Sequence, residues 1–98
     1  MKNEVAKRVI KEFNNLPLYV QVKASQEKAN IEKAKDFIDL TKLSDVSKME
    51  GTDEPYYRLK FGNYRYLLYY DIETETLEVL SLTHRKDTYK KQNLPWRR

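Results

Sequence analysis

The sequence predicts one α+β domain, in which a pair of helices packs on one face of a small and mainly antiparallel sheet. Three observations lead to this fold class. Apolar residues recur at helical spacing through residues 3–38, two strand-like runs flank Gly62-Asn63, and a third strand-like run follows them. Helices that precede all the strands favour an α+β arrangement over alternating units. The chain of 98 residues has the length of a single domain, 1–98.

The segment 3–38 is predicted to form an antiparallel helical hairpin. Asn3 is a suitable cap for the first helix, and Asn14-Asn15-Leu16-Pro17 ends it, so that Pro17 opens the second. Helices joined by so short a break should lie antiparallel. Residues 18–22, taken alone, are also compatible with a strand. The apolar residues at helical spacing are Val5, Ala6, Val9, Ile10 and Phe13 in the first helix and Val20, Ala24, Ile31, Ala34 and Ile38 in the second.

The segment 39–55 is predicted to contain one further turn and a loop before the sheet begins. Its polar end, Glu50-Gly51-Thr52-Asp53-Glu54-Pro55, is typical of a loop. Four apolar residues of the segment are expected to reach the core, namely Leu40, Leu43, Val46 and Met49.

The segment 56–83 is predicted to be a three-stranded meander whose first turn is Gly62-Asn63. These two residues tolerate the positive φ values of a two-residue hairpin loop. With this loop, Lys60 lies opposite Arg65 and Leu59 opposite Tyr66, and a polar turn at 71–75 leads to the third strand. Side chains alternate between the two faces of a strand. One face therefore carries Tyr57, Leu59, Phe61, Tyr64, Tyr66 and Leu68, and the other carries Arg58, Lys60 and Arg65.

Three cations on adjacent strands point to an anionic ligand, because like charges directly across a strand pair are destabilising. The C-terminal segment 84–98 adds positive charge: it holds six Lys or Arg side chains and one acidic residue, Asp87, and so carries +5 where the whole chain carries +4. Within it we expect a helical turn at 87–92, followed by a tail. Such a segment suits nucleic acid, an acidic protein partner or a solvated tail, and the charge pattern leaves all three open.

The composition excludes several classes of chemistry. There is no cysteine, which excludes disulfides and thiolate sites, and with one histidine any metal site would depend on carboxylates. We therefore predict no metal and no cofactor. The sequence has no apolar run of about 20 residues and no signal-peptide pattern, so we expect a cytoplasmic protein with no membrane partner.

Three motifs in order carry a family resemblance. K-x-x-G at 48–51 precedes Y-R-x-x-x-G-x-Y-R at 57–65, and H-R-x-x-x-Y follows at 84–89. Together they resemble the RelE/ParE superfamily of bacterial type II toxin–antitoxin systems. The resemblance implies the RelE-like fold, a cognate antitoxin and, as in the RelE-like mRNA interferases, an endoribonuclease that cleaves mRNA on the ribosome. Two alternatives stay open. The ParE branch instead inhibits DNA gyrase, and the cationic face would also suit a binding module for an acidic, antitoxin-like partner.

The resemblance also assigns residues to the proposed site. It places Arg58 and Lys60 at the basic positions of the first hairpin strand, Arg65 at the hairpin arginine, and Arg85 and Tyr89 just beyond the last strand. The candidate catalytic residues are Arg65, Arg85, Tyr89, Lys60 and His84, and the candidate RNA-binding residues are Arg58, Lys60, Lys86, Lys90 and Lys91.

Each candidate has a role in metal-independent RNA cleavage, which must deprotonate a 2′-OH and stabilise the charge of the phosphorane. The cations supply the charge stabilisation, and Arg85 is the candidate for the leaving oxygen. Tyr89 is the candidate general base, since surrounding cations favour phenolate; alternatively it stacks on a base or orients the 2′-OH. His84 is suited to proton transfer, but its strand parity is opposite to that of Arg85.

The chain departs from the family at its start. Members begin with a strand before the first helix, and here only residues 1–4 precede the helical pattern. The first strand is therefore missing, very short or supplied by a partner. An unpaired sheet edge is usually covered, so edge-strand pairing with an antitoxin, or a homodimer, is expected at that edge.

Overall fold

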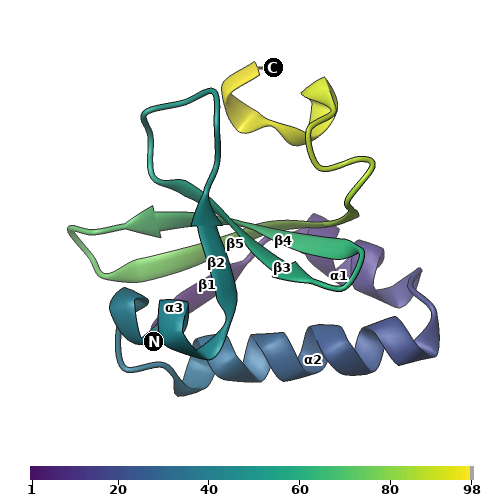
Figure 1. Ribbon diagram of the computed structural model, residues 1–98, viewed down its shortest axis with the longest axis horizontal. Helices are drawn as coiled ribbons and strands as arrows, with labels where there is room; N and C mark the ends of the chain where they lie inside the picture. The colour runs from purple at the N-terminus through teal and green to yellow at the C-terminus, as the bar shows by residue number, and fades with distance from the viewer. Residues whose placement is uncertain (98) are drawn as a thin grey trace.

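The computed structural model describes residues 1–97, so that Arg98, the last cation of the basic segment, lies outside the described residues. It has an α+β fold built on a five-stranded sheet with the order β1-β5-β4-β3-β2. β1 runs parallel to β5, and the other neighbours are antiparallel. Figure 1 shows the long helix α2 on one side of the sheet and the C-terminal segment on the other.

Apart from the short strand β1 at the start, the helices precede the strands as predicted. The helices are α1 Lys7–Asn14, α2 Leu18–Lys33 and α3 Phe37–Leu43. The strands are β1 Asn3–Val5, β2 Asp45–Lys48, β3 Tyr56–Phe61, β4 Tyr64–Asp71 and β5 Thr76–His84. Two 3₁₀ helices, η1 Lys91–Asn93 and η2 Pro95–Arg97, close the described chain. No helix of residues 1–97 is long and apolar enough to cross a bilayer.

The ends of two helices follow from local sequence. Pro17 stands directly before α2 with φ −56°, the value that its ring imposes and a helix start requires. Asp36 caps α3, where its carboxylate accepts a hydrogen bond of 2.8 Å from the N–H of Asp39. Residues 18–22 are therefore helical, and the strand alternative for them is wrong.

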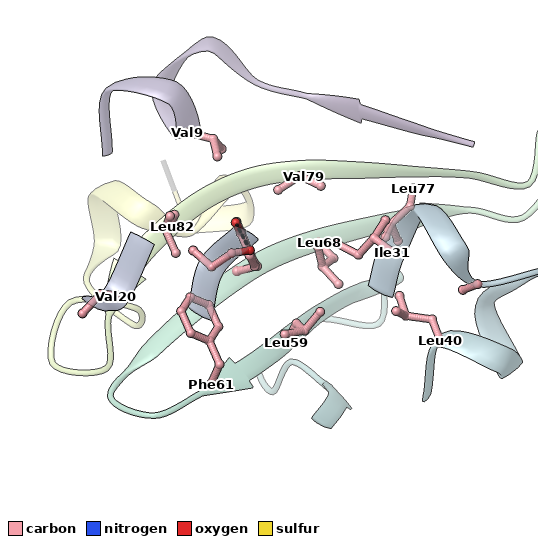
Figure 2. Packing of buried hydrophobic residues seen from close by; sticks show 13 residues of the cluster. Val9, Val20, Ile31, Leu40, Leu59, Phe61, Leu68, Leu77, Val79 and Leu82 are labelled. Atoms are coloured by element: carbon pink, nitrogen blue, oxygen red, sulfur yellow. Dashed lines mark hydrogen bonds between the residues drawn. The ribbon is translucent and has the colours of Figure 1, made fainter. Parts of the chain in front are cut away.

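The main core lies between the sheet and the helices. Ile31, Leu40, Leu59, Leu68, Leu77 and Val79 are fully buried there, and Figure 2 shows them packed together with side chains from α1 and α2. The hydroxyl of Tyr66 in β4 donates to the carbonyl oxygen of Ala24 at 3.0 Å and so ties the sheet to α2. The predicted core face of the hairpin is confirmed.

The predicted hairpin register is also confirmed. Phe61 pairs with Tyr64, and Lys60 pairs with Arg65. One detail of the turn differs. Gly62 has φ +57°, but Asn63 does not have a positive φ. A positive φ at the first loop position alone is that of a type II′ turn, which matches strand twist as well as the type I′ turn does.

Two short strands were not predicted. Asn3–Val5, expected at the start of the first helix, is β1, and its three residues pair with Leu77, Glu78 and Val79. The helical prediction for 3–38 is therefore wrong at both ends, since residues 37–38 belong to the separate helix α3. The predicted loop in 39–55 likewise contains β2, which forms the edge of the sheet beside β3. Of the three alternatives for the first strand of the family, the very short strand is therefore the correct one.

The C-terminal segment covers a second, smaller core on the opposite face of the sheet. Met49, Leu67 and Leu94 are buried there, and Tyr56, Leu80 and Trp96 pack against them. The ring centroids of Tyr56 and Trp96 lie 4.8 Å apart. The described part of the predicted tail at 93–98 is therefore packed against the sheet, because Leu94 and Trp96 have apolar surface to cover.

Candidate nucleic-acid interface

The strand register gathers the predicted cations on the face opposite α2. Asp45, Lys60, Arg65 and Thr83 stand opposite one another across β2, β3, β4 and β5. Arg58 follows Lys60 on the same face of β3, two residues along. Three positive side chains therefore share one end of this face, next to the Gly62-Asn63 turn.

The loop after β5 adds two more groups to this surface. The N–H of Arg85 donates to the carbonyl oxygen of Asn63 at 2.7 Å, which holds the start of the loop against the hairpin turn. Further along the loop, the hydroxyl oxygen of Tyr89 accepts a hydrogen bond from Nη1 of Arg58. Tyr89 is 44% exposed, so its hydroxyl group is available to a ligand. We call Arg58, Lys60, Arg65, Arg85 and Tyr89 the cationic cluster.

Arg65 lies at the centre of the cationic cluster. Its Nη1 donates to the carbonyl oxygens of Tyr64 at 2.8 Å and Gly62 at 3.0 Å. Partial burial lowers the pKa of the Arg65 guanidinium, and the charges of Arg58 and Arg85 act in the same direction. Asp45 and Tyr89 act in the opposite direction and raise the pKa of Arg65. The guanidinium stays positive at neutral pH, since arginine starts far above it. An anion would relieve the repulsion among the three guanidinium groups.

The loop is held from its far side by a network that reaches α1. Nδ2 of Asn93 donates to the carbonyl oxygen of Asp87 at 2.7 Å, and its Oδ1 accepts a bond of 2.7 Å from Nη2 of Arg8. The same Arg8 nitrogen pairs with Glu12 at 3.0 Å. Glu12 in turn accepts from the N–H of Leu82 in β5 at 3.0 Å. The segment that carries Arg85 and Tyr89 is therefore attached to the rigid body of the fold.

His84 is not brought into the cationic cluster. Its ring packs edge-on against Tyr64 with centroids 5.2 Å apart, and Tyr64 contacts the main core on the helical side of the sheet. Its Nδ1 accepts a hydrogen bond of 3.2 Å from the N–H of Lys86. This placement follows the opposite parity of His84 and Arg85, and it gives His84 a structural contact.

The remaining predicted RNA-binding residues lie outside the cationic cluster. Lys86, Lys90 and Lys91 are exposed on the segment that follows β5. Lys90 forms an ion pair of 2.7 Å with Asp87, and its hydrogen bond lowers the pKa of that carboxyl. These lysines extend the positive surface, but the charge of Lys90 is partly offset by Asp87.

The K-x-x-G motif closes a loop. Nζ of Lys48 donates to the carbonyl oxygens of Met49 and Thr52 at 3.3 and 3.0 Å. Gly51 has φ +87°, which favours glycine, and the Trp96 ring lies beside it. This motif supports the second core and does not contribute to the cationic cluster.

Sequence reasoning missed one charged neighbour of the cluster. Asp45 stands opposite Lys60 on the edge strand β2 and is exposed. The carboxylate partly offsets the positive charge at one side of the surface. Its position can be found only once β2 is recognised as a strand.

The arrangement can bind a phosphodiester and stabilise charge on it. Guanidinium groups match phosphate oxygens in a bidentate geometry. Arg58 and Arg85 lie near enough to Arg65 for their charges to act on it, so that three guanidinium groups share this surface. Within residues 1–97 no group of three or more His, Asp or Glu side chains is placed to hold a metal ion.

The architecture defines a small α+β protein with helices on one face of a mixed sheet and cations on the other. Within that class the chain has the fold of RelE toxins, which confirms the fold that the three motifs implied. The isolated Escherichia coli RelE toxin matches with a TM-score of 0.61 and 16% identity, over 85% of this chain and 82% of the other.

Two archaeal structures match more closely than the E. coli toxin. The RelB–RelE antitoxin–toxin complex of Methanococcus jannaschii gives a TM-score of 0.69 at 23% identity, over 88% of this chain and 94% of the other. The RelE–RelB complex of Pyrococcus horikoshii gives a TM-score of 0.67 at 24% identity, over 86% of this chain and 93% of the other. No protein-family model and no curated protein sequence matches the chain.

Proposed function

We propose that the chain is the toxin of a type II toxin–antitoxin system and acts as a metal-independent, ribosome-dependent mRNA endonuclease. The observation that carries the proposal is the hydrogen bond from Arg58 to Tyr89 within a group of four cations. A surface made only to attract an acidic partner has no need for a tyrosine hydroxyl held among phosphate-binding groups.

The cations supply the electrostatic part of the reaction. Attack of a 2′-oxygen on the neighbouring phosphorus gives a phosphorane whose negative charge exceeds that of the substrate. Preorganised cations aimed at such developing charge are usually the largest catalytic contribution. In this proposal Arg65 and Lys60 bind the non-bridging oxygens, and Arg85 stabilises the departing 5′-oxygen.

Tyr89 supplies the proton-acceptor part. Arg58 donates to the Tyr89 oxygen, which fixes that oxygen at the cationic cluster. In the proposed reaction Tyr89 acts as the phenolate: its oxygen accepts the proton of the 2′-OH, the 2′-oxygen forms a bond to phosphorus, and the bond from phosphorus to the 5′-oxygen breaks. The departing 5′-oxygen takes its proton from water. The products are a 2′,3′-cyclic phosphate and a 5′-OH end.

The ribosome compensates for the lack of a general acid in the site. His84, the side chain best suited to protonate a leaving oxygen near neutral pH, packs on Tyr64 on the other face of the sheet. A site without a complete acid–base pair gains most from a substrate that is already held in the reactive geometry. We therefore propose that cleavage depends on mRNA presented in the A site.

A cognate antitoxin is part of the same proposal. The M. jannaschii and P. horikoshii structures are RelB–RelE complexes. By analogy, we propose that an antitoxin protein inhibits this chain by covering its active surface. An acidic segment of that antitoxin would complement the cationic cluster.

Cleavage on programmed ribosomes tests the function. The purified protein is incubated with mRNA free in solution and with the same mRNA bound to ribosomes, and the ends are mapped. We expect cuts inside A-site codons only on ribosomes, with 2′,3′-cyclic phosphate ends. Intact mRNA from folded protein would overturn the nuclease proposal. Inhibition of DNA gyrase supercoiling by the same sample would then assign the ParE-like alternative.

A further inference from the structure

Two buried hydroxyl groups connect the sheet to the loop that carries Tyr89. Oγ1 of Thr83 lies 3.0 Å from Oγ1 of Thr88. Thr83 is 9% exposed and Thr88 is 3% exposed. Thr83 stands opposite Arg65 in the sheet, and Thr88 directly precedes Tyr89. The pair therefore connects the backbone of the two cluster residues Arg65 and Tyr89 through buried contacts.

The hydrogen bonds of the pair have a defined direction. Oγ1 of Thr88 donates to the carbonyl oxygen of His84 at 3.3 Å. A hydroxyl has one proton to donate, so Thr88 accepts from Thr83 while it donates to His84. The bond from Thr88 to His84 adds to the backbone bond that the N–H of Asp87 donates to the same carbonyl oxygen at 2.8 Å, and together they close the turn at residues 84–88. A shift of Thr88 along the sheet would break both bonds.

Stability does not require hydroxyl groups at these positions. Replacing both partners of a buried hydrogen bond with apolar groups of the same shape can be nearly neutral. The bonds of Arg85 to Asn63 and of Asn93 to Asp87 hold the two ends of this segment, whereas an apolar pair would leave the position of Thr88 between them less well defined, because dispersion contacts have little directional preference. What the two threonines add is a fixed position of the loop relative to the sheet.

We propose that Thr83 and Thr88 are positioning residues, whose hydroxyl pair sets the Tyr89 side chain against Arg58 in the cationic cluster. The positioning itself is independent of any reaction. Its catalytic consequence rests on the proposed nuclease function, because a misplacement of about 1 Å can reduce an enzymatic rate about 100-fold.

The first test follows Tyr89 itself. Proteins labelled with ¹³C at tyrosine Cζ are compared by NMR, with the Tyr89 signal assigned by its loss in Tyr89→Phe. The shift in Arg58→Ala marks a Tyr89 without its partner. We expect Thr88→Val and Thr83→Val to move the signal toward that of Arg58→Ala, and Thr88→Ser, which keeps the hydroxyl, to leave it in place.

Thr76→Val is the matched control. Thr76 is also buried, at 6% exposure, and lies at the other end of β5, where its hydroxyl donates to the carbonyl oxygen of Thr74. A wild-type Tyr89 signal in both Thr88→Val and Thr83→Val would overturn the proposal, and so would an equal displacement in Thr76→Val. The two variants remove the same bond from opposite sides, so loss of folding in one leaves the other as the test.

The second test measures single-turnover cleavage on programmed ribosomes. We expect Thr88→Val to lower the rate at saturation about 10- to 100-fold, with an unchanged half-saturating concentration, and Thr88→Ser to restore the rate. A wild-type rate in Thr88→Val would overturn the catalytic consequence. If the wild-type protein does not cleave, the proposed function fails, and the NMR comparison alone decides the positioning.

Discussion

Arg58 and Tyr89, which lie 31 positions apart in the sequence, are joined by a hydrogen bond between a guanidinium nitrogen and a phenolic oxygen. Arg58 comes from the interior strand β3, and Tyr89 comes from the loop beyond β5. The contact places a hydroxyl group among four cations, and the predictions on activity depend on this arrangement.

Tyr89→Phe removes the hydroxyl and keeps the ring. If the hydroxyl accepts the 2′-OH proton, single-turnover cleavage on ribosomes should fall about 10²- to 10⁴-fold, while ribosome binding stays unchanged. If Tyr89 acts only by stacking on a base, the rate should stay near that of the wild-type protein. Tyr19→Phe, at a tyrosine that is 70% exposed on α2, is the control and should cleave normally.

Gly62→Ala should destabilise the fold through the backbone alone. Gly62 has φ +57°, and a Cβ at this position meets no atom within 4 Å. The left-handed conformation costs a non-glycine residue about 1–2 kcal/mol, and chemical denaturation should show a loss of that size. Asn63→Ala, the neighbouring change at a residue without positive φ, should cost less. Equal losses in the two variants would contradict the type II′ turn.

Tyr66 should make the fold sensitive to alkaline pH. Burial raises the pKa of Tyr66 to about 12, and the charge of Glu27 acts in the same direction. In the unfolded chain a tyrosine titrates near pH 10. Between about pH 10 and 12 the unfolded state therefore loses this proton while the folded state keeps it, and the free energy of unfolding falls as pH rises.

Tyr66→Phe isolates this effect. It removes the bond to Ala24 and should cost about 1 kcal/mol at neutral pH, because a buried hydrogen bond between the sheet and α2 is lost. The difference between the variant and the wild-type protein should then shrink above pH 10. Denaturation curves collected from pH 7 to 11.5 measure this difference in the free energy of unfolding. A difference that stays constant across this range would contradict the assigned titration.

The hairpin of β3 and β4 could be predicted from the sequence because its side chains alternate regularly between two faces. Residues 56–70 alternate between faces over two full strands around one glycine turn, so that a register shift by one residue would expose the whole core face. The positions of Arg58, Lys60 and Arg65 followed from this pattern.

Short elements and loops could not be predicted in the same way. β1 has three residues, and Val5 and Ala6 continue the helical spacing of Val9, so the local pattern favoured a helix. Val5 is in fact 38% exposed, and its position is set by pairing with Val79 of β5. β2, with only four residues, gave too little alternation to recognise.

The face of the sheet on which Arg85 and Tyr89 lie could not be derived either. Both residues follow the last strand, where the alternation of side chains ends. Their positions depend on contacts between distant residues, such as those of Asn93 with Asp87 and Arg8. The motif placed both residues in the site, but only tertiary contacts define where the loop lies.

The most direct test of the central claim compares Arg85→Ala with Lys23→Ala. Both changes remove one exposed positive charge, Arg85 at the cationic cluster and Lys23 on α2. Cleavage of A-site codons on programmed ribosomes is measured for each variant, together with its thermal unfolding. We predict that Arg85→Ala loses cleavage while it unfolds at the wild-type temperature, and that Lys23→Ala keeps both. Undiminished cleavage by folded Arg85→Ala would contradict the proposed active site.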